Sequence, residues 1–79
     1  MTGRYFPELL KPWEVAAVFG VDPKTVARWV REGRLHPVPL PGGVGAGHRR
    51  YFRAEVDAIV AGTPLTAAQL DALKRGEKP

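Results

Sequence analysis

The chain has 79 residues, with 12 Lys or Arg against 8 Asp or Glu and a formal net charge of +4 at pH 7. This length allows one small domain with a modest core and leaves no room for a second domain. The sequence has no cysteine, which excludes disulfides. It has no apolar run of about 18 residues, which argues against a membrane span, and no charged start followed by an apolar core, which argues against a secretion signal, so we expect a soluble cytoplasmic protein.

Residues 1–9 show no hydrophobic periodicity and are predicted to form an N-terminal tail, although Tyr5 and Phe6 are apolar enough to rest on the core. Residues 10–62 are assigned to the main domain. Residues 63–79 are assigned to a C-terminal helix and tail.

A first helix is predicted from Pro12 to Phe19. Glu14, at the third helical position, can accept a hydrogen bond from a free backbone amide, and Leu10 can pack against Val15. Trp13 fits either the edge of the core or an exposed position, and the sequence does not distinguish them. The residues expected to face inward have helical spacing: Val15, Ala16 and Phe19.

A second helix follows after a tight turn at Gly20 and Val21. Asp22 is a good N-cap residue and Pro23 suits the first helical position. Gly33 is expected to end the helix. Val26 and Trp29 would pack against the first helix, and the two helices together form a helix-turn-helix.

The second helix is predicted to carry a basic stripe opposite its apolar side. Lys24, Arg28 and Arg31 recur at spacings of four and three residues. A solvated helix of any function can carry such residues. In a helix-turn-helix, however, the second helix enters the DNA major groove, so a basic stripe on that helix favours DNA binding. Lys24 to Arg53 holds seven Lys or Arg and one acid, a local balance of +6, which points to a polyanionic partner on one face.

The segments Leu35–Leu40 and Arg49–Phe52 are predicted to pair as a two-stranded hairpin around a loop with four glycines. Glycine-rich loops also bind phosphates in nucleotide enzymes, but this loop lacks the Lys-Ser/Thr pair and spacing of a P-loop. We interpret the hairpin as the wing of a winged helix. Pro37, Pro39 and Pro41 alternate, which suits an edge strand.

Side chains should alternate along the returning strand of the wing. His48, Arg50 and Phe52 would point one way, and Arg49, Tyr51 and Arg53 the other. Phe52 is expected in the core. Two interpretations of Tyr51 carry equal weight: a core ring with its hydroxyl at the surface, or a phosphate contact.

A third helix is predicted over Ala54–Ala61, ending at Gly62, with Val56, Ile59 and Val60 inward. A fourth begins after Thr66, which forms a capping box with Gln69, and ends near Gly76. Its leucines either close the core against the first helix, the favoured option, or contact a neighbouring molecule: Leu65, Leu70 and Leu73. The predicted fold class is therefore mainly α with a small two-stranded β wing, a winged helix-turn-helix.

Catalysis is disfavoured because the chain has neither Cys nor Ser, and we predict no catalytic residue, cofactor or metal. His36 and His48 are twelve positions apart and belong to no zinc-binding motif. Glu55 and Asp57 fit the first turn of the third helix, where the helix dipole favours acids.

Base recognition is expected to rely on cations, because the chain has no Asn and its one Gln lies outside the basic face. Lys24, Arg28 or Arg31 would read guanine. The wing would sense minor-groove width at A·T pairs.

Several motifs together resemble the BldC-type developmental regulators of actinobacteria, small winged helices of the MerR-like and excisionase-like group. The resemblance covers about Leu9 to Gly62 and rests on Val21-Asp22-Pro23-Lys24-Thr25-Val26, Arg28-Trp29, Gly33, Leu35, Gly47-His48-Arg49-Arg50-Tyr51 and Glu55-Val56. It implies a DNA-binding transcriptional regulator. By position, the helix contacts would be Lys24, Thr25 and Arg28, and the wing contacts His48, Arg49, Arg50 and Tyr51.

This sequence departs from the family at two places. Lys11 replaces the usual Thr at the first N-cap, and residues 39–46 lengthen the wing. MerR-type regulators also carry a dimerising coiled coil and an effector domain, for which this chain has no counterpart, so no small-molecule effector is expected.

The predicted partner is double-stranded DNA, with no membrane and a nucleoid-associated location. The fourth helix shows no sustained heptads, so we expect a monomer in solution that self-associates head to tail on direct repeats. Two alternatives remain: an excisionase-like architectural factor that bends DNA, and a winged helix used only for protein contact.

Overall fold

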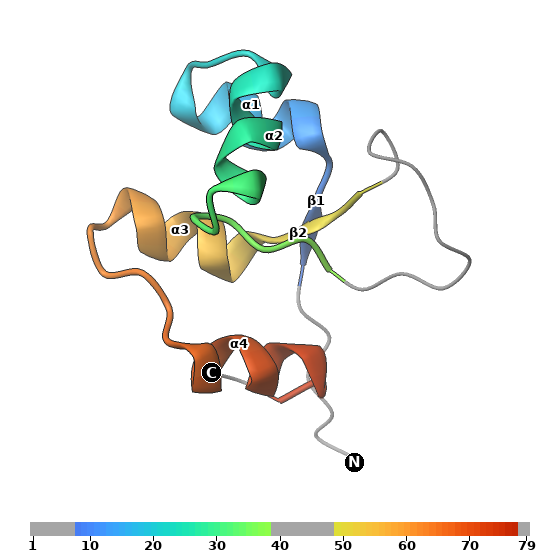
Figure 1. Cartoon of the computed structure of the whole chain (residues 1–79). Coiled ribbons are helices and arrows are strands. Elements are labelled where there is room, and N and C mark those ends of the chain that lie inside the picture. Colours follow the sequence, from blue (N-terminus) through green and yellow to red (C-terminus); the bar gives the residue numbers. More distant parts are fainter. Residues whose placement is uncertain (1–7, 39–48, 78–79) are drawn as a thin grey trace.

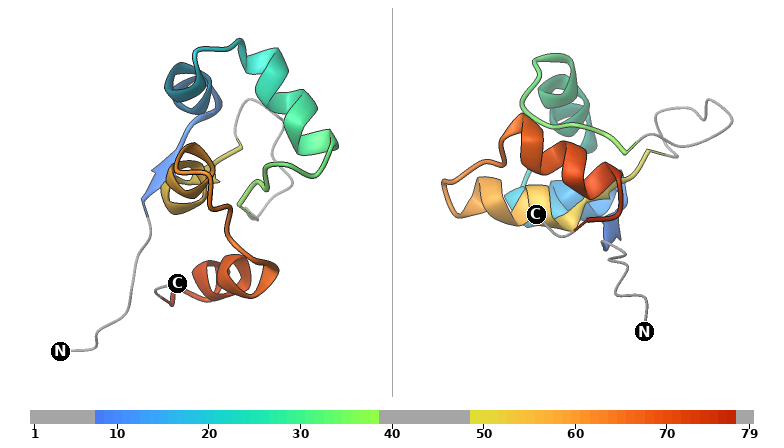
Figure 2. Two further views of the ribbon diagram at one scale, coloured as in Figure 1. Left: turned by 90° about the vertical axis from the view of Figure 1, so that its left-hand side faces the viewer. Right: turned by 90° about the horizontal axis from the view of Figure 1, so that it is seen from below.

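The computed structural model of the chain describes residues 8–38 and 49–77. Within these ranges the chain forms four helices and two short strands (Figure 1). In order they are β1 (Leu9–Leu10), α1 (Pro12–Phe19), α2 (Pro23–Arg31), β2 (Tyr51–Phe52), α3 (Arg53–Val60) and α4 (Ala67–Lys74). Figure 1 and the left view of Figure 2 show α3 and the strands between the α1–α2 pair and α4.

The helix-turn-helix is confirmed over the predicted residues. Gly20 ends α1 with φ at +68°, a left-handed conformation that favours glycine, and the Val21 amide donates to the Ala16 carbonyl at 3.0 Å. Asp22 occupies the N-cap of α2 without a side-chain cap bond, and its carbonyl accepts from the Thr25 amide at 2.9 Å. Gly33, with φ at +77°, follows the end of α2.

The capping interactions predicted for α1 and α4 are present. The Lys11 amide donates to Glu14 Oε1 at 2.7 Å. The Gln69 amide donates to Thr66 Oγ1 at 3.1 Å, and the Thr66 amide donates to Gln69 Oε1 at 2.8 Å. These bonds satisfy first-turn amides that have no partner inside the helix.

The strand pairing differs from the predicted hairpin. β2 pairs antiparallel with β1, Leu9 opposite Phe52 and Leu10 opposite Tyr51, so Leu9 lies in a strand that the sequence did not predict. The other expected strand contributes only the Pro37–Tyr51 bridge within the described ranges, with the Val38 amide donating to the Arg50 carbonyl at 2.7 Å. Pro37 has no amide hydrogen to extend that ladder. The glycine-rich loop lies outside the described residues.

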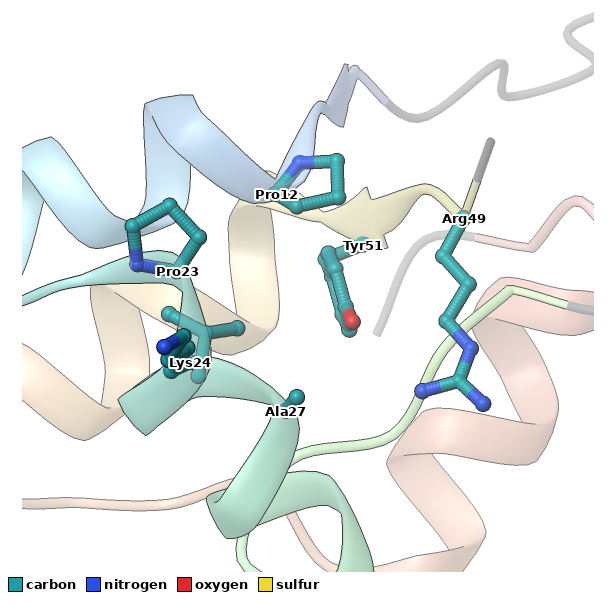
Figure 3. A pocket seen from close by; sticks show the side chains of 7 residues that line it. Pro12, Pro23, Lys24, Ala27, Arg49 and Tyr51 are labelled. Carbon is teal, nitrogen blue, oxygen red and sulfur yellow. The ribbon is translucent and has the colours of Figure 1, made fainter. Parts of the chain in front are cut away.

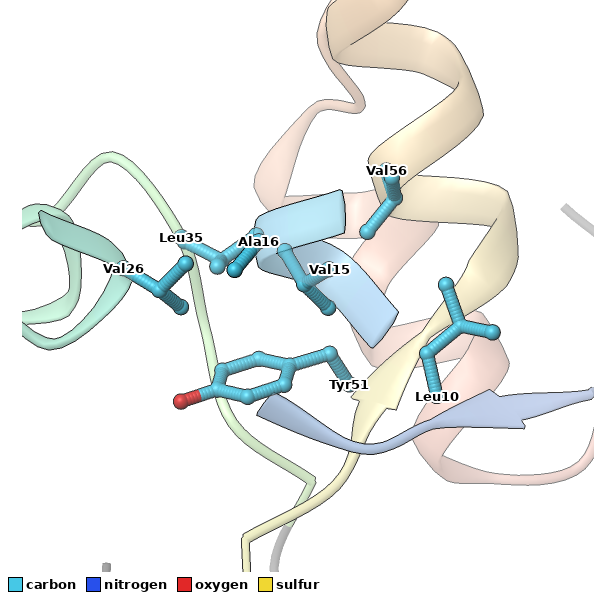
Figure 4. Close-up of a cluster of buried hydrophobic side chains, with 7 residues drawn as sticks. All are labelled: Leu10, Val15, Ala16, Val26, Leu35, Tyr51 and Val56. Carbon is cyan, nitrogen blue, oxygen red and sulfur yellow. The ribbon is translucent and has the colours of Figure 1, made fainter. Parts of the chain in front are cut away.

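The buried residues form two clusters on either side of β2. The first joins α1, α2 and α3 through Leu10, Val15, Ala16, Val26, Leu35, Tyr51 and Val56 (Figure 4). The second contains Phe52, Leu70 and Leu73, with Val38, Ala54 and Leu65 packed against it. The leucines of α4 thus pack on Phe52, which corrects the expectation that they close the core against α1. They do so because β2, buried on both sides, offers them an apolar face.

Two further side chains are now placed. Val56 is buried and Ile59 packs against the first cluster, as expected, whereas Val60, also expected inward, is 59% exposed on α3. Trp13 is 55% exposed, with the Lys11 ammonium 5.2 Å from its ring centroid. In the described part of the chain, no helix is long and apolar enough to cross a membrane.

Candidate nucleic-acid interface

The outward side of α2 carries the predicted basic stripe. Lys24, Arg28 and Arg31 are exposed, whereas Val26 on the opposite side is buried against α1. Thr25 is half-buried beside them. The amphipathic character of α2 therefore directs three cations to solvent in one row.

Glu32, at the C-cap of α2, lies between two arginines. Its carboxylate is 3.8 Å from Arg28 Nε and 3.2 Å from Arg34 Nε. The Arg28 side chain is 56% exposed, and exposed pairs of this kind contribute at most about 1 kcal/mol. Arg28 therefore loses little if it leaves Glu32 for another anion.

A hollow of about 270 Å³ separates the first half of α2 from β2 (Figure 3). Its floor is apolar, formed by Val26, Ala27 and the ring of Tyr51 together with two prolines that begin α1 and α2. Lys24 and Arg49 supply the charged side chains of its wall. Figure 3 shows them coming from different elements, Lys24 from α2 and Arg49 from the segment before β2.

Tyr51 is a core residue and not an exposed wing contact. It is 1% exposed within the first cluster, which favours the core interpretation of its ring. Its hydroxyl points into the hollow between Ala27 and Arg49 (Figure 3). Phe52 faces the opposite cluster, so the predicted alternation of these two side chains holds, but both sides of the strand are covered.

The basic residues around β2 have different surroundings. Arg49 and Arg50 are half-buried, and Arg50 Nη1 donates to the Arg49 carbonyl at 2.9 Å. Arg53, expected on the Arg49 side of the strand, is instead the first residue of α3, and its side chain lies 3.2 Å from Glu8 and 3.7 Å from Asp57. His48 lies outside the described residues.

Sequence reasoning missed one hydrogen-bonded pair beside this face, between a buried carboxylate and a histidine. Glu55 is in the first turn of α3, as expected, but it is buried and its Oε2 lies 2.7 Å from His36 Nδ1. The His36 amide also donates to Glu55 Oε1 at 3.3 Å. The two residues are 19 positions apart, and no local pattern links them.

Another charged pair lies at the end of α4. Arg75 donates two hydrogen bonds to Glu77, at 3.0 and 3.2 Å, and this bonding lowers the pKa of the Glu77 carboxyl and raises that of the guanidinium. Within residues 8–38 and 49–77, no group of three or more His, Cys, Asp or Glu is placed to hold a metal ion.

The sequence of the chain matches the model of a known family. Residues 9–63 match the model of a family described as a helix-turn-helix domain, a span that runs from β1 through α3. A search of curated proteins found no match. The family match does not single out the BldC-type subgroup, which stays a prediction. The chain belongs to the helix-turn-helix domain family and is a DNA-binding protein.

Proposed function

We propose that the protein is a transcription regulator that inserts α2 into the DNA major groove and sets the segment around β2 on the adjoining backbone. One observation carries this proposal. Cations from two separate elements, Lys24 on α2 and Arg49 before β2, lie on the wall of one hollow, and the exposed row continues along α2 through Arg28 and Arg31. A duplex presents phosphates on both sides of its major groove, so cations on two elements match its charge pattern.

The exposed residues of α2 divide into base and backbone contacts in this proposal. Arg28 lies in the middle of the row and has both terminal guanidinium nitrogens outside its contact with Glu32, which involves Nε. A guanidinium reads guanine O6 and N7 by a bidentate contact. Lys24 and Arg31 flank Arg28 and contact guanine or phosphate, and Thr25 contacts a thymine methyl or a phosphate.

The hollow between α2 and β2 accommodates the sugar-phosphate backbone beside the groove. Its apolar floor suits the carbon face of a deoxyribose, and Arg49 can bind the phosphate. Arg50 and His48 extend the backbone contact along the wing. The backbone contact of His48 is proposed from the resemblance to BldC-type regulators alone.

The protein acts as a monomer in solution and self-associates head to tail on direct repeats, without a small-molecule effector, on the nucleoid. The packing of α4 supports a monomer in solution. Leu70 and Leu73 are buried on Phe52 of the same chain, so α4 as the structure describes it has no exposed leucine stripe for a coiled coil. One recognition helix reads few base pairs, so a second copy on DNA supplies specificity.

A salt titration of DNA binding tests the proposed function. If each monomer neutralises about four to six phosphates, log affinity falls with log salt at a slope of about −4 to −5. Binding is measured by fluorescence anisotropy on a selected site and on a random duplex, with transcription from a reporter carrying the selected site. A slope near zero contradicts DNA binding, and strong bending of the site without an effect on the reporter favours an architectural factor instead.

A further inference from the structure

Glu55 is a buried carboxylate whose two oxygens are occupied by a single residue. Oε1 accepts from the His36 backbone amide at 3.3 Å and Oε2 lies 2.7 Å from His36 Nδ1. The Glu55 side chain is 4% exposed and that of His36 is 46% exposed. A buried carboxylate is costly unless it is hydrogen-bonded, so this pair fixes both the main chain and the ring of His36 against α3.

The His36–Glu55 pair links the chain that enters the wing to the chain that leaves it. We call residues Pro37–Val38 and Arg49–Phe52 the wing base. His36 directly precedes the first side of the wing base, and Glu55 is in the first turn of α3, which begins immediately after the second side. The contact between them therefore closes the wing base from the side of α3.

Few main-chain interactions hold the first side of the wing base. The described residues show the Pro37–Tyr51 bridge and the bond from the Val38 amide to the Arg50 carbonyl at 2.7 Å. Pro37 donates no hydrogen bond. Leu35, one residue before His36, is buried in the first cluster, and Val38, two residues after it, packs on the second. His36 therefore lies where the chain passes from the first cluster to the second.

We propose that Glu55 is a positioning residue for DNA binding, which by holding His36 sets the wing base, and with it Arg49, at a fixed place relative to α2. The inference rests on the proposed function. Glu55 itself touches no DNA, because it is buried behind the wing base. Its effect reaches DNA through Arg49, which lies on the hollow opposite α2, and not through Lys24, which α2 positions independently.

Double-mutant cycles on DNA affinity test this inference. Glu55→Ala is combined with Arg49→Ala and, separately, with Lys24→Ala, at a temperature where circular dichroism shows every variant folded. We expect Glu55→Ala alone to weaken binding by about fivefold or more, and its effect to shrink below about twofold when Arg49 is already absent. With Lys24→Ala the losses should multiply independently. The salt slope of Glu55→Ala should also fall by about one, as for Arg49→Ala.

One conservative variant, one substitute variant and a matched acid separate positioning from general stability. Glu55→Gln keeps an acceptor for the His36 amide, and its side-chain NH2 can donate to the unprotonated Nδ1 of the neutral ring, so it should recover most of the affinity that Glu55→Ala loses. If Glu55→Ala does not fold, His36→Ala takes its place in both cycles, because His36 is half exposed. Asp57 is an exposed acid on the same helix, paired only with Arg53 among the described contacts. Asp57→Asn should leave affinity within about twofold of wild type and the salt slope unchanged.

The outcomes distinguish this inference from the function on which it rests. If the wild-type protein does not bind DNA, the proposed function is rejected and the inference with it. If the wild type binds but Glu55 and Arg49 act independently, or Asp57→Asn has the same effect as Glu55→Ala, the positioning role alone is overturned.

Discussion

The rings of Phe19 and Trp29 meet at 88° with their centroids 5.2 Å apart, so the last residue of α1 packs edge to face on the second half of α2. Nearby, Val26 of α2 packs against Val15 and Ala16 of α1. Together these contacts fix the rotation of α2 about its own axis. Rotation decides which side chains face solvent, so the packing of α1 sets the orientation of the basic row.

Trp29→Ala should therefore destabilise the fold. Truncation of a large aromatic ring that packs on the core costs about 3 kcal/mol or more, which lowers the melting temperature of a domain this size by more than 10 °C. Thermal unfolding is followed by circular dichroism at 222 nm. Trp13→Ala is the control, because that ring is 55% exposed and its loss should cost below about 0.5 kcal/mol. Equal losses of melting temperature in the two variants would show that the Phe19–Trp29 contact contributes no special stability to the fold.

The features that the sequence predicted are mostly local in the chain. The bounds of α1 follow from Pro12 and Gly20, and those of α2 from Asp22, Pro23 and Gly33. Caps and left-handed glycines act within a few residues, and their chemistry is visible in the sequence itself. The exposed row on α2 was equally predictable, because helical spacing alone defines it.

The features that the sequence did not predict are contacts between distant segments. β1 pairs with β2 across more than forty residues, and two-residue strands carry no alternation pattern to find. Glu55 is hydrogen-bonded to His36, 19 positions away in the sequence. The leucines of α4 pack on Phe52 and not on α1. Each of these contacts depends on how elements pack in space, so only the structure reveals that Tyr51 is buried beneath the hollow.

Thr66→Ala should reduce stability through the start of α4. The variant loses the bond from the Gln69 amide to Thr66 Oγ1, which costs about 1 kcal/mol and about 4–8 °C in melting temperature. Thr63→Ala is the matched control, because Thr63 is exposed in the connection between α3 and α4. An unchanged melting temperature for Thr66→Ala would mean that α4 unfolds independently of the domain.

Arg28→Ala should reduce sequence discrimination. On the preferred site we expect a loss of about 1–3 kcal/mol in binding free energy, and a smaller loss on random DNA, because a bidentate guanine contact exists only on the right sequence. Arg75→Ala removes the same charge from the end of α4, where Arg75 pairs with Glu77, and should affect both duplexes little. Equal losses for Arg28→Ala on both duplexes would assign Arg28 to the backbone.

Arg49→Ala should weaken binding to all sequences similarly and reduce the salt slope by about one, as expected when one phosphate contact is lost. Arg50→Ala should behave in the same way if Arg50 binds a second phosphate. Lys74→Ala, at the end of α4, is the control for a general change in net charge. A loss confined to one sequence would contradict the assignment of Arg49 to the backbone.

Assembly on DNA gives the last prediction. A contact between different surfaces of two monomers does not close on itself, so an array on direct repeats can grow with the number of sites. We expect analytical ultracentrifugation to show a monomer in free solution, and binding to duplexes with one, two and four direct repeats to become tighter per site as repeats are added. The control duplex carries the same half-sites as an inverted repeat, on which two-fold dimers would bind best. A stable dimer in free solution, or tighter binding to the inverted repeat, would contradict the head-to-tail arrangement while leaving DNA binding by α2 intact.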